Sequence, residues 1–323
     1  MRHATIFRYS IPFSGGAVLR DAQPKTRDGL ILRLTEDRRE GWGEAAPLPK
    51  FSRESLAQAE TDLRNAAQRW LEYAAPPEDS CPSAAFASSC AQAELDGVLP
   101  EARATRGALL CDGDLDTFIA RLRASSNIAL AKLKIGRDTP EREGERINLL
   151  LSMFPYLRLR LDANRVFTLD EARRFAQKIA LPFRARIDFI EEPCVDSLTS
   201  LAFAQETAIA IAWDESARET GFVVQAVSGV AAIVVKPTLT GSIAHCRALC
   251  DAARRQKLSA VISSSIESTL GLTQLARLAA WLTPETPHGL DTAHLLGTQV
   301  LRRWRDCETP KLDIDDLEER WRA

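Results

Sequence analysis

Five charged residues each come at the end of a short apolar segment: Lys134, Asp162, Glu191, Asp214 and Lys236. One such residue alone is most simply a solvated loop residue, but five in equivalent positions predict a shared site. Three carboxylates suit Mg²⁺, which keeps water or substrate oxygens as its other ligands. A lysine beside that ion can take a proton from the carbon next to a carboxylate, and the ion offsets the resulting negative charge. The residue types therefore predict metal-assisted proton abstraction from a small carboxylate substrate.

Alternation of side chains along a strand adds further residues to this site. In the segment AKLKI, Lys132 and Lys134 share one face and the apolar residues share the other. In LRLRLD, Arg160 and Asp162 lie on the face opposite the leucines. The exterior of a barrel packs on helices and needs the apolar face, so Lys132 and Arg160 are predicted to face the interior. Charges there are costly unless they are paired or bind a metal. The second residue of the EE pair, Glu192, is predicted to point away and to support the site.

Repeated strand–helix units must position these residues. From about residue 105, short apolar segments alternate with helical ones, and the polar residues that end the segments recur every 22 to 29 positions. Room for one more unit on each side, around Leu109 and Gly289, predicts eight strands. No GxGxxG follows the first strand, so a TIM-type barrel is favoured over a dinucleotide-binding sheet. The six strands that carry these polar residues are expected at 128–135, 157–162, 187–192, 209–214, 230–236 and 260–264.

The first 95 or so residues have a different pattern, typical of an α+β unit. Runs of β-branched and aromatic residues at 5–11 and 30–34 predict strands. Apolar residues three and four apart over 52–73 predict an amphipathic helix with Ser52 as its N-cap, and 83–95 predicts a second helix. Further along, Thr168 begins a capping-box pattern and Ser242 is a candidate N-cap.

Composition excludes several classes of protein. Lys and Arg number 42 against 44 Asp and Glu, so the chain lacks the basic excess of a nucleic-acid-binding protein. No apolar run is long enough to span a bilayer, and the N-terminus lacks the apolar region of a secretory leader. The seven cysteines form no CxxC pair, which argues against a disulfide framework or zinc site. We expect a cytoplasmic enzyme without nucleic-acid or membrane partners. The sequence leaves the oligomeric state open, a monomer being one option.

Several segments together resemble the enolase superfamily and, within it, the o-succinylbenzoate synthase family of menaquinone-making bacteria. The segments, which lie between positions 19 and 272, are LRDAQPKTRDGL, GWGEAAPLPKFS, AKLKIG, LRLDANR, FIEEPC, IAWDES, VVKPTLTGS and VISSSIESTLGL. The resemblance implies an α/β fold, a (β/α)7β TIM-type barrel with an N-terminal α+β capping domain. We expect the capping domain at residues 1–98, completed by residues 296–323, and the barrel at residues 99–295.

The resemblance also implies a role for each site residue. Lys134 would be the acid/base, Lys236 the cation across the barrel, and Asp162, Glu191 and Asp214 the Mg²⁺ ligands. Substrate would be bound by four further residues: Lys132, Arg160, Ser263 and Ser264. The implied reaction is syn loss of water from 2-succinyl-6-hydroxy-2,4-cyclohexadiene-1-carboxylate through an enediolate, giving o-succinylbenzoate. Enolase-superfamily sites use a lysine base with Mg²⁺ in this way.

Other functions remain open at this point. Two opposed lysines also suit a two-base racemase or epimerase, and the same residues serve cycloisomerases, although the long matching segments favour the synthase. A lyase that forms a Schiff base on a barrel lysine would leave the three carboxylates without a role. A binding protein on a barrel scaffold would not need the complete ligand set.

Overall fold

The computed structural model describes residues 1–14, 24–101, 107–111, 115–124 and 128–323. The chain divides into two compact units. Unit 1 comprises residues 1–105, 236–248 and 262–323, and unit 2 comprises residues 106–235 and 249–261. A chain of this length is expected to form more than one core.

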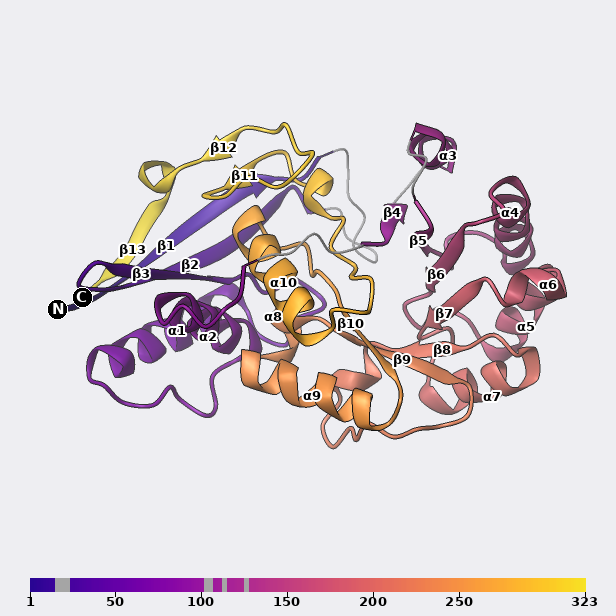
Figure 1. The fold of residues 1–323 in the computed structure, drawn as a ribbon, viewed down its shortest axis with the longest axis horizontal. Helices are drawn as coiled ribbons and strands as arrows, with labels where there is room; N and C mark the ends of the chain where they lie inside the picture. Colours follow the sequence, from indigo (N-terminus) through magenta and orange to yellow (C-terminus); the bar gives the residue numbers. More distant parts are fainter. Residues whose placement is uncertain (15–23, 102–106, 112–114, 125–127) are drawn as a thin grey trace. The chain divides into compact units, whose positions relative to one another are not determined.

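Unit 1 is built on a four-stranded antiparallel sheet (Figure 1). Its order is β13-β1-β2-β3, with β1 at Arg2–Pro12, β2 at Thr26–Glu36, β3 at Arg39–Ala45 and β13 at Glu318–Arg322. Helices α1 (Leu56–Leu71) and α2 (Pro82–Leu95) pack against this sheet and share its apolar core. The predicted strands at 5–11 and 30–34 and the α+β character of this region are confirmed.

The N-terminus of α1 differs from the prediction. Ser55, not Ser52, is the N-cap, and it forms a capping box with Gln58. The Ser52 hydroxyl instead accepts a hydrogen bond from the Leu48 backbone N–H at 2.9 Å. The helix therefore begins three residues later than Ser52 would place it.

Helix α2 approaches β3 backbone to backbone. A Cβ atom added at Gly41 would lie 1.9 Å from the Ala91 carbonyl oxygen, and one at Gly43 would lie 1.8 Å from the Ala87 carbonyl oxygen. Only glycine leaves room for so close a contact. The small residues of α2 and the glycines of β3 thus set the spacing between helix and sheet.

The remainder of unit 1 comes from the second half of the chain. It contains α8 (Pro237–Thr240), α10 (Thr269–Leu282), η2 (Ala293–Leu295), η3 (Ile314–Asp316) and the parallel pair β11 (Gln299–Val300) and β12 (Lys311–Leu312). Helix α9 (Ile243–Arg255) begins in unit 1 and ends in unit 2. Ser242 does cap α9, because its hydroxyl accepts a hydrogen bond from His245 N.

Unit 2 carries most of a seven-stranded sheet in the order β10-β9-β8-β7-β6-β5-β4, whose strands β4 to β9 pair in parallel. The strands are β4 (Leu109–Cys111), β5 (Leu130–Lys134), β6 (Arg158–Asp162), β7 (Ile187–Glu191), β8 (Ile211–Trp213), β9 (Val230–Val235) and β10 (Ser259–Ile262). The predicted (β/α)7β TIM-type fold is confirmed. At the expected eighth position the structure has only a parallel bridge between Ser263 and Gly289.

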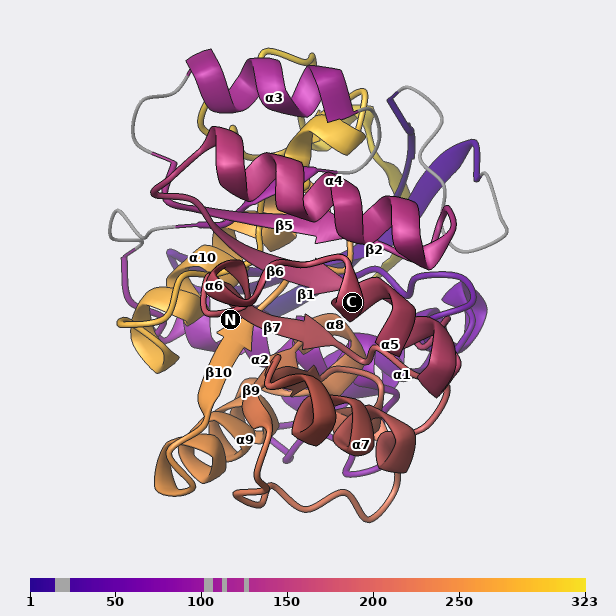
Figure 2. The ribbon, with the colours of Figure 1, turned by 90° about the vertical axis from the view of Figure 1, so that its right-hand side faces the viewer.

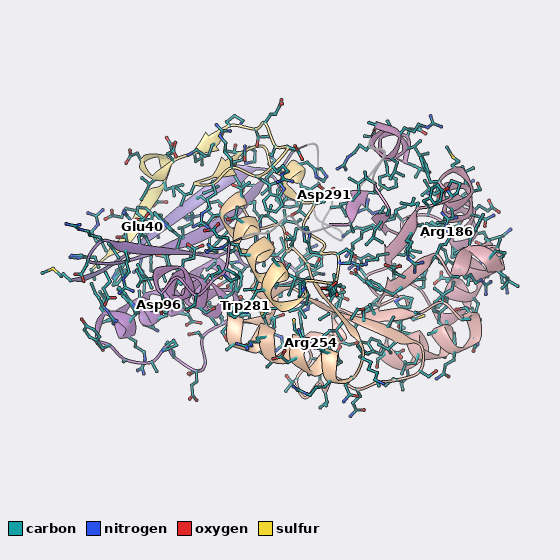
Figure 3. All side chains as sticks on the ribbon, viewed as in Figure 1. Glu40, Asp96, Arg186, Arg254, Trp281 and Asp291 are labelled. Atoms are coloured by element: carbon teal, nitrogen blue, oxygen red, sulfur yellow. The ribbon has the colours of Figure 1, made fainter. Side chains whose placement is uncertain are left out.

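Helices connect these strands. They are α3 (Leu115–Ala124), α4 (Pro140–Met153), α5 (Leu169–Gln177), α6 (Leu181–Arg184), α7 (Ser197–Thr207) and η1 (Ser216–Arg218). Figure 2 shows α4, α5 and α7 on one side of β5, β6 and β7. The predicted capping box of α5 is present between Thr168 and Glu171. Arg186, labelled in Figure 3, precedes β7 and donates to the carbonyl oxygens of Leu151 and Leu157, so that it joins α4 to the start of β6.

Two further observations concern the whole chain. Among the described residues, no helix is both long enough and apolar enough to cross a lipid bilayer. All seven cysteines are free thiols, and Cys246 and Cys250 are buried on α9.

Candidate active site

The sheet register of unit 2 places three of the predicted residues side by side. Lys134 at the end of β5 pairs with Asp162 at the end of β6, and Asp162 pairs with Glu191 at the end of β7. Asp214 comes directly after β8, whose Ala212 pairs with Glu191. All three carboxylates are almost completely buried. Because the strands are parallel, their carboxyl ends meet at one edge, as the sequence predicted.

Lys132 joins two of these carboxylates. Its Nζ lies 2.6 Å from Glu191 Oε2 and 3.1 Å from Asp162 Oδ2. Burial opposes the charged form of Lys132, but the negative charges of Asp162 and Glu191 outweigh it and raise the pKa of this lysine above its ordinary value. Lys132 is therefore a fixed cation between two of the predicted metal ligands.

Lys134 points toward a residue that the sequence reasoning missed. Its Nζ lies 3.4 Å from Asn164 Oδ1. Asn164 also donates its backbone N–H to Asp162 Oδ1 at 3.3 Å, and it has a φ of +47°, a conformation that asparagine tolerates better than most residues. The sequence did contain an indication of this residue, because in the segment DAN an asparagine follows the predicted ligand Asp162 by two positions.

The three carboxylates fit a divalent ion by chemistry. Carboxylate oxygens are the ligands that Mg²⁺ prefers, and the chain offers three of them at neighbouring strand ends. Within the described ranges, however, no three His, Cys, Asp or Glu side chains are gathered closely enough to form a ready-made cage. Asp214 lies near a cation, with its Oδ1 3.6 Å from Arg218 Nη2. Lys132 contacts Asp162 and Glu191, and Arg218 contacts Asp214, so the carboxylates at this edge already have positively charged partners.

Arg160 is buried on β6, where its guanidinium lies over the ring of Phe189 at 5.1 Å. Its Nε is 3.6 Å from Asp188 Oδ2, a charge contact within the sheet. Burial lowers the pKa of Arg160, an effect that Asp188 and Glu191 partly offset. Both a substrate-orienting role and an internal salt bridge are compatible with this setting.

The other predicted site residues belong to unit 1. Lys236 is buried and its backbone caps α8. The Ser263 hydroxyl donates to the Gly289 carbonyl oxygen at 3.2 Å. The Ser264 hydroxyl donates to Glu267 Oε2 at 2.6 Å and also contacts the Thr292 hydroxyl at 2.9 Å. Both serine hydroxyls are thus engaged within the protein.

Glu267 is the second residue that the sequence reasoning missed. Besides Ser264, it accepts hydrogen bonds from the Thr238 hydroxyl at 2.6 Å and the Ser265 N–H at 2.7 Å. Burial raises the pKa of Glu267 above its ordinary value, although its hydrogen bonds work in the opposite direction. Through Thr238, two residues after Lys236, this carboxylate ties α8 to the segment after β10.

Comparison with known families agrees with the architecture. Residues 1–95 match the family described as "MenC, N-terminal domain", and residues 114–315 match "Enolase C-terminal domain-like". The o-succinylbenzoate synthase of Thermosynechococcus elongatus BP-1, solved with Mg in its active site, has a similar fold. Its TM-score is 0.71 at 24% identity, covering 89% of this chain and 92% of that one.

Two curated relatives match along their whole length. The o-succinylbenzoate synthase of Pectobacterium atrosepticum is 52% identical over 323 residues, which is 100% of both chains. That of an Enterobacter species is 54% identical over 318 residues, covering 98% of this chain and 99% of the relative. At this level of identity over the full length, the chain belongs to the o-succinylbenzoate synthase family of the enolase superfamily.

Proposed function

We propose that the strand-end cluster of unit 2, Lys132, Lys134, Asp162, Glu191 and Asp214, is the catalytic part of an o-succinylbenzoate synthase site. Membership of the family makes the chain a carbon–oxygen lyase of menaquinone biosynthesis. The proposal concerns which residues do the chemistry. The observation that carries it is the shared register of Lys134, Asp162 and Glu191, since it aligns a lysine and two buried carboxylates at the ends of three neighbouring strands.

Asp162, Glu191 and Asp214 would hold one Mg²⁺. When bound, the ion supplies positive charge where the substrate carboxylate becomes an enediolate. Lys132 already contacts Asp162 and Glu191, and its ammonium adds positive charge at the same place. A substrate carboxylate that enters this edge would meet these cations in a buried setting, where charge interactions are strong.

Lys134 would move the proton. The bond between hydrogen and the carbon next to the carboxylate would break, and its electron pair would form the enediolate double bond between that carbon and the carboxylate carbon. That pair would then form a ring double bond to the neighbouring carbon as the bond from that carbon to the hydroxyl oxygen breaks. Lys134 would return the proton to the departing oxygen, so that water leaves and the ring becomes aromatic. One group can do both steps because proton and hydroxyl leave from the same face. Lys236 would stabilise the enediolate as a cation without handling the proton.

Solvent deuterium exchange tests this division of roles. Lys134→Ala should lose both dehydration and exchange at the carbon next to the carboxylate. Lys236→Ala should lose most of the rate without a change in which face is deprotonated. Lys178→Ala is the control, because that half-exposed lysine pairs with Glu145 on a neighbouring helix. Exchange that survives in Lys134→Ala but disappears in Lys236→Ala would reverse the assignment.

Turnover of the cyclohexadiene substrate with and without Mg²⁺ tests the metal requirement. We expect activity to disappear with EDTA and to return on addition of Mg²⁺. Activity that is unchanged in EDTA would contradict the metal site.

The remaining expectations concern where the enzyme works. We expect it to act in the cytoplasm on a small carboxylate, and the seven free thiols support a reducing compartment. Assay of fractionated cells checks the location.

A further inference from the structure

Glu192 lies beside the proposed ligand Glu191, yet its side chain has a different environment. It is completely buried, and its φ of +37° lies in the left-handed region, which is unfavourable for a residue with a side chain. Alternation along β7 predicted that Glu192 points away from Glu191 and supports the site. Its carboxylate bonds to the segment that follows β8. A strained conformation of this kind persists only where the surroundings enforce it.

Four donors surround this carboxylate. Glu192 Oε1 accepts from the backbone N–H groups of Asp214 at 3.1 Å and Ser216 at 2.8 Å. Its Oε2 accepts from Arg165 Nε at 3.1 Å and the Ser216 hydroxyl at 3.3 Å. A carboxylate has about four lone-pair sites, so protein donors fill them all. Glu192 is thus unsuited to be a metal ligand itself.

Arg165 extends the contact to a third strand. It follows Asp162 by three residues, and its Nη2 donates to the Ser216 hydroxyl at 2.6 Å and to Glu219 at 2.7 Å. The Arg165 backbone N–H also donates to the Glu192 carbonyl oxygen at 2.8 Å. The segments after β6, β7 and β8 therefore meet at Glu192. Asp162 and Glu191 end the first two of these strands, and Asp214 follows the third.

We propose that Glu192 is a positioning residue that holds Asp214 in place relative to Glu191, so that their carboxylates converge on one Mg²⁺. This inference rests on the metal site proposed above. Glu192 touches neither substrate nor ion and acts through the backbone of Asp214. Residues that orient metal ligands typically contribute about 10- to 100-fold to metal affinity.

Three substitutions at this position separate positioning from a general structural role. Glu192→Ala removes the acceptor and should raise the Kd for Mg²⁺ about 10- to 100-fold in isothermal titration. Glu192→Gln keeps one oxygen for the two backbone N–H groups and should restore most of the affinity. Glu192→Asp keeps the charge but is one methylene shorter, so it should bind Mg²⁺ more weakly than wild type even if the alanine variant does not fold.

Matched controls decide the outcome. Glu219→Gln changes a half-exposed carboxylate that bonds to the same Arg165 but to none of the strand-end N–H groups, and it should leave Mg²⁺ affinity unchanged. Melting temperatures in EDTA measure the stability effect separately. Wild-type affinity in folded Glu192→Ala or Glu192→Asp would overturn the inference, whatever the melting temperature does. If the wild-type chain itself binds no Mg²⁺, the proposed metal site fails, and this inference fails with it.

Discussion

Two groups of buried carboxylates in this chain are stabilised by different partners. At the strand ends of unit 2, Asp162 and Glu191 face the ammonium group of Lys132. In unit 1, Glu44 accepts from the Tyr9 hydroxyl at 2.6 Å, from Gly271 N at 2.8 Å, and from both the backbone N–H and the hydroxyl of Ser268. One group is held by a cation and the other by neutral donors.

This difference indicates what each group can do. Of the neutral donors around Glu44, those of Ser268 and Gly271 lie at the N-terminus of α10, where unpaired N–H groups and the helix dipole favour a negative charge. They hold the carboxylate in one geometry and join β3 to α10. A lysine ammonium is a compact point charge that does not enclose the carboxylates it contacts, so a second cation can share them. The comparison predicts that substitutions in unit 2 affect catalysis and those in unit 1 affect stability.

The largest effect is expected at Asp214. Asp214→Ala should lower kcat at least about 1,000-fold, since charge stabilisation of several kcal/mol is removed and each 1.36 kcal/mol is a factor of ten. Mg²⁺ affinity should fall while the fold stays intact, because the change also relieves repulsion among buried carboxylates. Isothermal titration and circular dichroism check both points. The exposed Asp170→Ala is the control, and unchanged Mg²⁺ affinity in Asp214→Ala would contradict the assignment.

The second effect concerns stability. Glu44→Ala should lower the free energy of unfolding by about 3 kcal/mol, because several buried donors lose their acceptor at roughly 1–3 kcal/mol each. Urea denaturation measures it. Mg²⁺ affinity of the folded variant should stay within about twofold of wild type. Glu40→Ala, on the same strand and labelled in Figure 3, changes a half-exposed carboxylate and should have little effect. A loss of metal affinity without loss of stability would refute the distinction drawn between the two regions.

The third effect concerns Arg160, which could act in catalysis or only in stability. Its side chain can orient the substrate, or it can serve only as a salt bridge within the sheet. Arg160→Met should raise KM about 10- to 100-fold with a smaller change in kcat, since a charge-assisted hydrogen bond contributes about 1.5–3 kcal/mol. Steady-state kinetics check this. Normal kinetics together with a lower melting temperature would instead assign Arg160 to the internal salt bridge with Asp188.

The smallest effect is a pH dependence at Glu267. Burial raises the pKa of this carboxyl in the folded state, so the folded chain binds its proton more tightly than the unfolded chain does. Stability should therefore fall as pH rises above the unfolded value of about 4.3. Glu267→Gln should remove this decline, so that the free energy of unfolding falls less between pH 4 and pH 7 in the variant than in wild type. Urea melts at both pH values check it, with the exposed Glu285→Gln as control. If the free energy of unfolding falls equally between pH 4 and pH 7 in wild type and in Glu267→Gln, the expected titration of Glu267 is contradicted.

The sequence was sufficient to predict local and periodic features. Lys134, Asp162 and Glu191 could be aligned because parallel strands share a register and side chains alternate along each strand. The α5 capping box was equally readable, since both of its residues lie within one turn. A TIM-type barrel followed from the recurrence of strand–helix units, and the resemblance to the enolase superfamily implied its (β/α)7β form.

Other features depend on contacts that no local pattern records. Ser52 and Ser55 are equally good N-caps by residue type, and the reciprocal bond with Gln58 decides between them. The backbone N–H groups that Glu192 accepts from lie 22 and 24 residues further along the chain, so no local pattern predicts these bonds. Glu44 and Ser268 are separated by more than 200 residues, so their hydrogen bonds arise only from the tertiary fold.

The backbone-to-backbone contact of α2 with β3 limits how this part of the protein can change over evolutionary time. Gly41 and Gly43 place the strand so near the Ala87 and Ala91 carbonyl groups that a single added methyl group would collide with them. Neighbouring side chains cannot relieve that collision, because the atoms that meet belong to the main chain. A helix shifted by one residue would bring other side chains to the same two points. We therefore expect a library of substitutions at these glycines to yield few folded variants.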